Sequence, residues 1–316
     1  MKFKDIYPTL KLRSSEVVEV KSFEEICATL GEGGTTDGLP FQAEMRKYCG
    51  RTFKVFRRVK KIIIENANTG LRGIRNTVIL DGVICDGAAH GSCCRACYFL
   101  WKEAWLTRAD HQRQAKPQLD KLLVIEGEKI AQASKPSSTP CQSLSLITAT
   151  YPLSRWSLKP YIWDITDNAS QLPRRLFLLT VSLTRKILRI FGVQLSNKLS
   201  SPQEKTPAAD FDLQPGDMVE VKSLDEIRIT LDDSGKNRGL GFTREMKRFC
   251  GRQLAVLKPV DRIIIEGTGE MRRISHTVIL EKGNCDGSAH NSCPRNCYLL
   301  WRKVWLRKLP HKSSNK

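Results

Sequence analysis

The stretch VVEVKSFEEICATL, residues 17–30, occurs a second time as MVEVKSLDEIRITL, residues 218–231. Extending the alignment to LWKEAWL and LWRKVWL needs a single gap and leaves about half of the aligned positions identical. Such similarity within one chain indicates an internal duplication. The sequence therefore predicts two related modules, at about 15–108 and 214–308, separated by an insert at 109–213.

The first stretch has the pattern of a strand followed by a short helix. Residues 17–21 are rich in branched side chains, and Ser22 with Glu25 three positions later forms the capping-box pattern of a helix start. A Gly-rich loop and a second short helix, FQAEMRKYC at 41–49, are expected next. Gly50 is placed to end that helix in the left-handed conformation.

Three runs rich in branched and aromatic residues follow, RTFKVFRRV, KIIIE and NTVIL, and they favour β-strands. After them, the spacing of His90, Cys93 and Cys97 predicts a helix that carries all three on one face. Trp101 and Trp105 are interpreted as core residues. The sequence therefore predicts a mainly β protein with short helices (α+β), in which two small barrels of the Src homology 3 type, each with a cysteine-rich metal site, are joined by a partly helical insert.

Eleven cysteines occur in the chain, and most of them lie in CDGAAHGSCCRAC at 85–97 and CDGSAHNSCPRNC at 285–297. The opening residues, MKFKDIYPTL, lack the apolar run of a secretory signal, so we expect a cytoplasmic protein. Because cytoplasmic thiols are kept reduced, the clustered cysteines are interpreted as metal ligands. The cysteines shared by the two modules are Cys49, Cys85, Cys93 and Cys97 in the first and Cys250, Cys285, Cys293 and Cys297 in the second.

Zinc is the expected metal, since it binds four thiolate or imidazole ligands in tetrahedral geometry. Two ligand sets stay open at this point: the four cysteines of each module, or a set in which His90 or His290 replaces one cysteine. An iron–sulfur cluster is the alternative cofactor, because CDGSAH resembles the signature of the CDGSH iron–sulfur domains. The string here has one additional residue before the histidine and lacks the upstream Cys-x-Cys pair of those domains.

The formal net charge of +19 favours partners with phosphate or carboxylate groups. Basic residues gather around the strand after the second short helix in both modules: Arg46, Lys47, Arg51, Lys54, Arg57 and Arg58, and Arg244, Lys247, Arg248, Arg252 and Lys258. We therefore expect a nucleic acid or an acidic protein as the candidate partner.

The insert contains a basic and apolar segment at 173–198. Its basic residues, with no acidic residue among them, are Arg174, Arg175, Arg185, Lys186, Arg189 and Lys198. The pattern predicts a basic amphipathic helix that could make peripheral contact with an anionic membrane.

Motifs that would indicate an enzyme are missing from the sequence. It contains no phosphate-binding glycine loop, dinucleotide fingerprint, nucleophile elbow or zinc-protease helix. We therefore expect a binding or accessory protein with a structural metal and without catalysis of its own, in which two modules raise avidity. The alternatives are an iron–sulfur redox or electron-transfer protein and a metal- or thiol-dependent enzyme.

The run from VEVKS through YCG and CDGAAHGSCCRACYFLWKEAWL to CQSLSLITATYPLSRWSLKPYIWDIT resembles a family of uncharacterised bacterial proteins. The resemblance covers about residues 15–190, and this chain departs from the family's pattern by adding a second cysteine-bearing module. Since no activity is established for the family, the resemblance implies a common architecture and supplies no mechanism.

Overall fold

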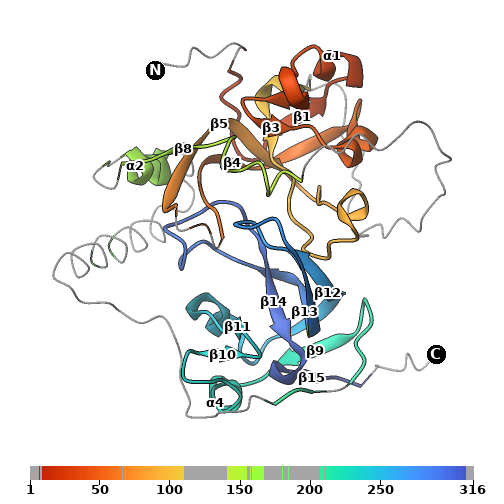
Figure 1. Cartoon of the computed structure of the whole chain (residues 1–316), viewed down its shortest axis with the longest axis vertical. Helices are drawn as coiled ribbons and strands as arrows, with labels where there is room; N and C mark the ends of the chain where they lie inside the picture. The colour runs from red at the N-terminus through yellow and green to blue at the C-terminus, as the bar shows by residue number, and fades with distance from the viewer. Residues whose placement is uncertain are drawn as a thin grey trace. The chain divides into compact units, whose positions relative to one another are not determined.

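The computed structural model describes residues 7, 9–65, 67, 69–109, 141–154, 157, 159–166, 180, 184, 207–209 and 211–310. The chain forms two compact units, one of residues 1–85 and 98–155 and the other of residues 86–97 and 156–316. Strands dominate both units and the helices are short (Figure 1). The predicted class, mainly β with short helices, is confirmed.

The first unit is built on one antiparallel sheet with the strand order β6-β5-β4-β1-β7. Its strands are β1 (Val17–Val20), β4 (Thr52–Ile63), β5 (Leu71–Leu80), β6 (Trp101–Lys102) and β7 (Leu106–Arg108), with β8 (Tyr151–Pro152) paired to β5 and a separate pair of β2 (Thr35–Thr36) and β3 (Leu39–Pro40). The helices are α1 (Phe23–Cys27) and the 3₁₀ helices η1 (Glu32–Gly34), η2 (Ala43–Tyr48) and η4 (Glu103–Trp105). Within the described residues the edge strands β6 and β7 do not pair with each other, so the pairings do not close a barrel.

The second unit repeats this order as β14-β13-β12-β9-β15. Its strands are β9 (Met218–Val221), β12 (Gln253–Ile264), β13 (Met271–Asn284), β14 (Tyr298–Arg302) and β15 (Leu306–Lys308), with a separate pair of β10 (Lys236–Asn237) and β11 (Leu240–Gly241). The helices are η3 (Ala88–His90), α2 (Lys159–Thr166), α4 (Leu224–Arg228), η6 (Arg244–Phe249) and η7 (Lys303–Trp305). β12 and β13 form a long hairpin (Figure 1).

Residues 86–97 of the first sequence repeat belong to the second unit through defined contacts. The Cys94 amide donates to the Arg262 carbonyl at 2.9 Å, and the Arg95 guanidinium donates to the Tyr298 carbonyl at 2.6 Å. The cysteine-rich loop of one repeat is thus packed on strands of the other repeat, a feature that no local sequence pattern indicates.

Local signals place the short helices in both units. Ser22 Oγ accepts from the Glu25 amide at 3.2 Å and the Glu25 carboxylate accepts from the Ser22 amide at 2.9 Å, which confirms the predicted capping box at α1. Ser223 and Glu226 form the same box at α4. Gly50, with φ of 71°, ends η2 in the predicted left-handed conformation.

Two expectations about regular structure are wrong. RTFKVFRRV and KIIIE are one continuous strand, β4, because irregularities in its pairing after Val55 and Val59 absorb the break in the pattern. The helix expected from His90 onward does not form: η3 ends at His90, and Ser92 and Ala96 have positive φ values of 59° and 52°. Left-handed residues at these positions interrupt the helical hydrogen-bond ladder.

The core of each unit is organised around a buried tryptophan, as predicted. Trp105 and Trp305 are both fully buried. Each indole N–H donates at 3.0 Å to a buried threonine, Thr36 in the first unit and Thr230 in the second. The indole contact is of the same kind in both cores, although Thr230 corresponds to Thr29 and the counterpart of Thr36 is Asn237.

A buried carboxylate distinguishes the first unit and leads to a stability prediction. Glu103 accepts from the amides of Lys11 and Leu12, both at 3.0 Å, and pairs with Arg58 at 2.9 Å, while its side chain is fully buried. Glu103→Gln is expected to lower the free energy of unfolding of this unit by about 1.5–3 kcal/mol, because charged hydrogen bonds are lost. Lys303→Gln, at the corresponding position of the second repeat, is the control; Lys303 pairs with Asp212 at 3.8 Å, so its replacement should cost less than that of Glu103. Equal effects in denaturant titrations would contradict this role of Glu103.

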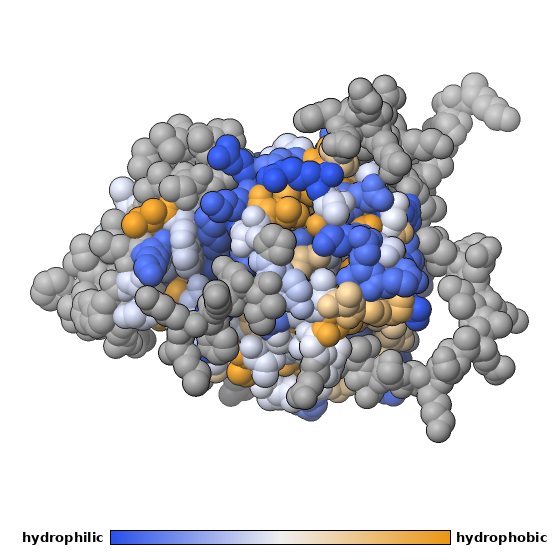
Figure 2. All heavy atoms as spheres, turned by 90° about the horizontal axis from the view of Figure 1, so that it is seen from above, coloured by the Kyte–Doolittle hydropathy of each residue, from blue (hydrophilic) through white to orange (hydrophobic). Residues whose placement is uncertain are grey.

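The surface of the described residues is mixed in hydropathy (Figure 2). On the face drawn in Figure 2, hydrophobic residues form separate patches among hydrophilic ones. No helix in the described part of the chain is long and apolar enough to cross a membrane. The basic segment predicted at 173–198 lies outside the described residues, apart from Thr180 and Thr184.

Candidate metal centre

Three potential metal ligands meet in the second unit: Glu245, Cys285 and His290. One ligand atom of each, a carboxylate oxygen, the thiol sulfur and an imidazole nitrogen, lies within 4.8 Å of the other two. Glu245 is on η6, Cys285 follows the end of β13, and His290 is in the loop after Cys285. Oxygen, sulfur and nitrogen donors of these types are all zinc ligands.

The loop after Cys285 is shaped by its own backbone hydrogen bonds. The amides of His290 and Ser292 both donate to the Gly287 carbonyl at 2.9 Å, and the Cys285 amide donates to the Cys297 carbonyl at 2.8 Å. These bonds fold the loop back so that His290 lies near Cys285. The Asp286 carboxylate accepts from the Ser288 amide at 2.9 Å and stabilises the same turn.

The position of Glu245 is fixed by the short helix that carries it. In η6 the Met246 amide donates to the Thr243 carbonyl at 3.0 Å, and the Met246 side chain is buried in the core. Arg248, on the same helix, pairs with Asp286 at 2.5 Å. The helix that bears the carboxylate is therefore tied directly to the loop that bears the thiol and the imidazole.

Glu245 is the most informative member of the group. Its side chain is fully buried, no lysine or arginine in the described part of the chain pairs with it, and its carboxylate faces the His290 imidazole at 3.4 Å and the Cys285 thiol. A carboxylate in the protein interior without a lysine or arginine partner is costly, and buried charges are normally paired or coordinate a metal. The charge of Glu245 therefore fits a cation held between it, Cys285 and His290.

The spacing of the donors fits a tetrahedral ion. Zinc bonds of about 2.0–2.2 Å to nitrogen and oxygen place two such ligands about 3.4 Å apart at neighbouring corners of a tetrahedron. His290 Nε2 and Glu245 Oε1 are 3.4 Å apart. With 40% of its side chain exposed, His290 lies on the solvent side of the group.

The thiol of Cys285 is held in its protonated form while no cation is near. Burial raises its pKa strongly, and the neighbouring Glu245 carboxylate raises it further. A bound divalent cation reverses this effect, because a coordinating thiol loses its proton to the metal.

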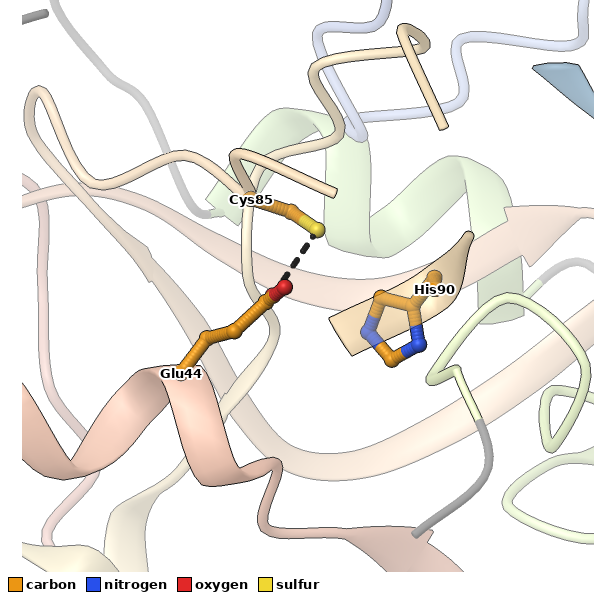
Figure 3. A group of neighbouring side chains, drawn as sticks. All are labelled: Glu44, Cys85 and His90. Carbon is orange, nitrogen blue, oxygen red and sulfur yellow. Dashed lines mark hydrogen bonds between the residues drawn. The ribbon is translucent and has the colours of Figure 1, made fainter. Parts of the chain in front are cut away.

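The first repeat contains the same three residue types. Figure 3 shows Glu44, Cys85 and His90 with the Cys85 thiol donating to the Glu44 carboxylate at 3.1 Å. Their ligand atoms also lie within 4.8 Å of one another. Glu44 is on η2, the counterpart of η6, so both repeats place a carboxylate opposite the cysteine and the histidine of the CDG loop.

The eight cysteines predicted as ligands have different surroundings. Cys85 and Cys285 belong to the two groups, as do the alternates His90 and His290. The remaining six, which are Cys49, Cys93, Cys97, Cys250, Cys293 and Cys297, are not part of either group. None of the eleven cysteines is paired in a disulfide.

Three of the six cysteines outside the groups favour the neutral thiol. Burial raises the pKa of Cys97 to about 12 and also raises the pKa values of Cys49 and Cys250. The Cys93 sulfur accepts from the Ile264 amide at 3.4 Å. The four-cysteine ligand set stays a prediction, whereas the Glu–Cys–His groups have their donors in place.

Sequence reasoning missed Glu44 and Glu245 because it searched for cysteine and histidine spacings. A signal was present: the dipeptide Glu-Met is kept in FQAEMRKYCG and FTREMKRFCG, while the two positions before it differ. Comparison of the repeats could therefore have added the carboxylate to the ligand candidates.

The glycine of the CDG loop provides a test of the loop's shape. Gly287 has φ of 80°, and a Cβ atom there would lie 2.5 Å from the Cys293 carbonyl oxygen. Gly251 has φ of 74° with open space around it. Gly251→Ala is expected to cost about 1–2 kcal/mol of stability through the left-handed conformation alone. Gly287→Ala must in addition displace the loop, so it should also weaken metal retention; equal losses of metal in the two variants would contradict this.

Comparisons with protein-family models, with curated proteins and with solved structures found no match to this chain.

Proposed function

We propose that the protein is a zinc-binding accessory protein in which each repeat holds one ion through a glutamate, a cysteine and a histidine. The observation that supports this most strongly is the fully buried Glu245 carboxylate, which has no lysine or arginine partner in the described part of the chain and faces Cys285 and His290. Glu44, Cys85 and His90 form the second site of the same kind.

The donor set favours zinc over other common metals. A thiolate with an imidazole suits zinc, copper or iron, whereas calcium and magnesium prefer oxygen donors alone. A carboxylate, a thiolate and an imidazole also satisfy the tetrahedral preference of zinc when a fourth ligand is added. Among the metals available in a reducing compartment, zinc is therefore the proposed occupant.

The proposed role of each ion is structural. Glu245 and Cys285 are on separate elements, and the loop that carries His290 contains four residues with positive φ, which are Gly287, Asn291, Ser292 and Asn296. Residues in that conformation interrupt regular secondary structure, so the loop is held by turn hydrogen bonds and not by a helix or sheet ladder. An ion bound to all three ligands would fasten it to η6, because metal-binding free energy adds to folding free energy.

The small-barrel architecture belongs to the same proposal. In each unit the strand that follows a 3₁₀ turn, β7 after η4 or β15 after η7, returns to pair with the first strand of the sheet, β1 or β9. This order supports a small barrel of the Src homology 3 type, a scaffold that presents binding surfaces. Two such modules on one chain suit a binding function.

Elemental analysis tests the proposal. Full-length protein purified without oxygen and without added metal should contain about two zinc ions per chain, one in each site, and should have no visible absorption band. Dialysis against a strong chelator should remove both ions and lower the unfolding temperature. Iron with visible charge-transfer bands would overturn the zinc assignment and favour the iron–sulfur alternative.

A metal-dependent enzyme is the second candidate. Three protein ligands are the number found in catalytic zinc sites, which keep a fourth position for water or substrate, and His290 is partly exposed. Replacing zinc by cobalt gives a visible spectrum that responds to added azide if this position is accessible. A large spectral change would favour the enzyme, whereas an unchanged spectrum would favour a structural ion.

A further inference from the structure

The two repeats differ in what covers the edge of their sheets. In the first unit, residues 141–152 form a turn followed by strand β8, which pairs with β5 at Arg72 and Gly73. In the second unit the corresponding residues of β13 are Arg272 and Arg273. No strand in the described part of the chain pairs with them on the side away from β12.

The segment 141–152, which covers this sheet edge in the first unit, is held by a buried glutamine. Gln142 accepts from the Leu100 amide at 2.9 Å and donates to the carbonyls of Leu100 and Pro40, both at 3.0 Å. It is only 5% exposed. One side chain thus connects the segment to two separate parts of the module.

An arginine of the sheet provides the second anchor. The Arg72 guanidinium donates to the Thr150 hydroxyl oxygen at 2.6 Å, to the Thr150 carbonyl at 2.9 Å and to the Ile147 carbonyl at 3.1 Å. Charge-assisted hydrogen bonds of this type are stronger than neutral ones. Arg72 therefore fixes the turn at the start of β8.

The same face is present in the second repeat but is less covered. Leu39 and Leu100 are buried in the first unit, whereas their counterparts Leu240 and Leu300 are half-buried. Gly38 packs on the Thr148 backbone, whereas its counterpart Gly239 has nothing within 4 Å of its Cβ position. The sequence contains one segment like 141–152, and the first unit uses it.

The arginine anchor of the first unit has a counterpart in the second. Arg272, the counterpart of Arg72, is 59% exposed, and its one ion pair among the described residues is with the equally exposed Glu270 at 3.0 Å. Such a surface ion pair contributes little to stability, so Arg272 can be redirected to a ligand at small cost.

The residues at the positions of Gly73 and Arg75 differ between the repeats, and they determine which side chain a docked segment can place there. Tyr151 packs directly on Gly73, where any Cβ would collide with its ring, and Arg75 lies over that ring at 5.2 Å. The second repeat has Arg273 in place of Gly73 and Ser275 in place of Arg75. A tyrosine is therefore excluded at this position of a ligand, and an acidic side chain facing Arg273 is favoured.

We propose that the β13 edge at Arg272–Arg273 is a docking site for a segment of another protein that imitates residues 141–152. The segment would consist of a turn with a glutamine, followed by a short strand added to β13 that carries an acidic residue where Tyr151 stands. Adding a strand to an exposed edge is a common mode of peptide recognition. The proposal does not depend on the metal sites.

A pair of peptides tests the proposal with the full-length protein. The probe is a fluorescent synthetic peptide of residues 141–153 with Cys141→Ser and Tyr151→Glu, and the matched control peptide keeps Tyr151. We expect the Glu peptide to bind and the Tyr peptide to bind at least about tenfold more weakly, because of the collision and the lost charge pair. Failure of the Glu peptide to bind would overturn the proposal.

Protein variants assign the site. Arg272→Ala should weaken binding of the Glu peptide about tenfold to a hundredfold through loss of its hydrogen bonds. Arg307→Ala, which removes another exposed arginine paired with a glutamate, is the charge control and should leave binding unchanged. Arg273→Gly should reverse the preference in favour of the Tyr peptide. Equal binding by wild type and Arg272→Ala would contradict the site.

Wild type and Arg272→Ala also test whether a second copy of the chain is the occupant. Sedimentation at increasing concentration should show no self-association that depends on Arg272. Self-association abolished by Arg272→Ala would instead identify a second copy as the partner and overturn the assignment to another protein.

Discussion

Replacing Glu245 by glutamine is expected to remove about one of the two zinc ions bound by each chain. The amide keeps the shape of the side chain but cannot supply the negative charge that a zinc ligand set needs. Glu44→Gln should remove the other ion, and the double variant should contain none. Glu281→Gln, which changes a carboxylate of the same unit outside the group, is the control and should keep both ions. Elemental analysis of the four proteins gives the result directly.

The stability of the Glu245→Gln variant is expected to change sign with the metal. In the presence of zinc it should be less stable than the wild type, because metal-binding free energy is lost. With a chelator at pH 8, above the ordinary titration range of imidazole, it should be more stable by about 1–3 kcal/mol, because a buried charge without a cationic partner has been removed. Destabilisation under both conditions would mean that Glu245 has a packing role only.

Trp305→Ala is expected to destabilise the second unit by about 3–5 kcal/mol. The indole is fully buried, its centroid lies 5.3 Å from that of Phe242, and its N–H donates to Thr230. The substitution removes this packing and leaves a cavity among β9, η7 and β15. Trp305→Phe keeps an aromatic ring and loses the hydrogen bond, so a smaller loss of about 1–2 kcal/mol is expected.

The measurement must separate the two units, because a chain with two units need not unfold in one step. Hydrogen exchange followed by mass spectrometry reports the protection of peptides from β9, β12 and β15 individually. Met218→Ala, at a residue 43% exposed in the same unit, is the control. A loss below about 1 kcal/mol for Trp305→Ala would place the core of this unit elsewhere.

Features encoded over a few residues were predictable from the sequence. The capping boxes at Ser22 and Ser223 and the left-handed Gly50 depend on neighbours three or four positions away, and all are found. Trp101 and Trp105 were correctly placed in the core. In each case the physical cause is local hydrogen bonding or the burial of a large apolar side chain.

Features that depend on distant contacts were not predictable in the same way. The spacing of His90, Cys93 and Cys97 fits one helical face, but left-handed residues at Gly91, Ser92 and Ala96 prevent a helix. Non-glycine residues adopt that conformation only where surrounding contacts impose it. Cys93 and Cys94 are indeed held by backbone groups of β12, which is about 170 residues away.

The candidate site was predicted in part for the same reason. Cysteine and histidine attract notice because clusters of them are unusual, so Cys85, Cys285 and the two alternates were identified. A glutamate on a short helix has the appearance of an ordinary surface charge, and only its burial shows otherwise. The fold converts Glu44 and Glu245 from common residues into candidate ligands.

X-ray absorption at the zinc edge of the full-length protein tests the central claim, the identity of the ligands, most directly. The Glu–Cys–His assignment predicts about one sulfur scatterer per zinc at about 2.3 Å, with nitrogen and oxygen scatterers at about 2.0–2.2 Å completing the shell. A shell of three or four sulfur atoms would contradict it and would favour the four-cysteine set of Cys49, Cys85, Cys93 and Cys97 with its counterpart in the second repeat.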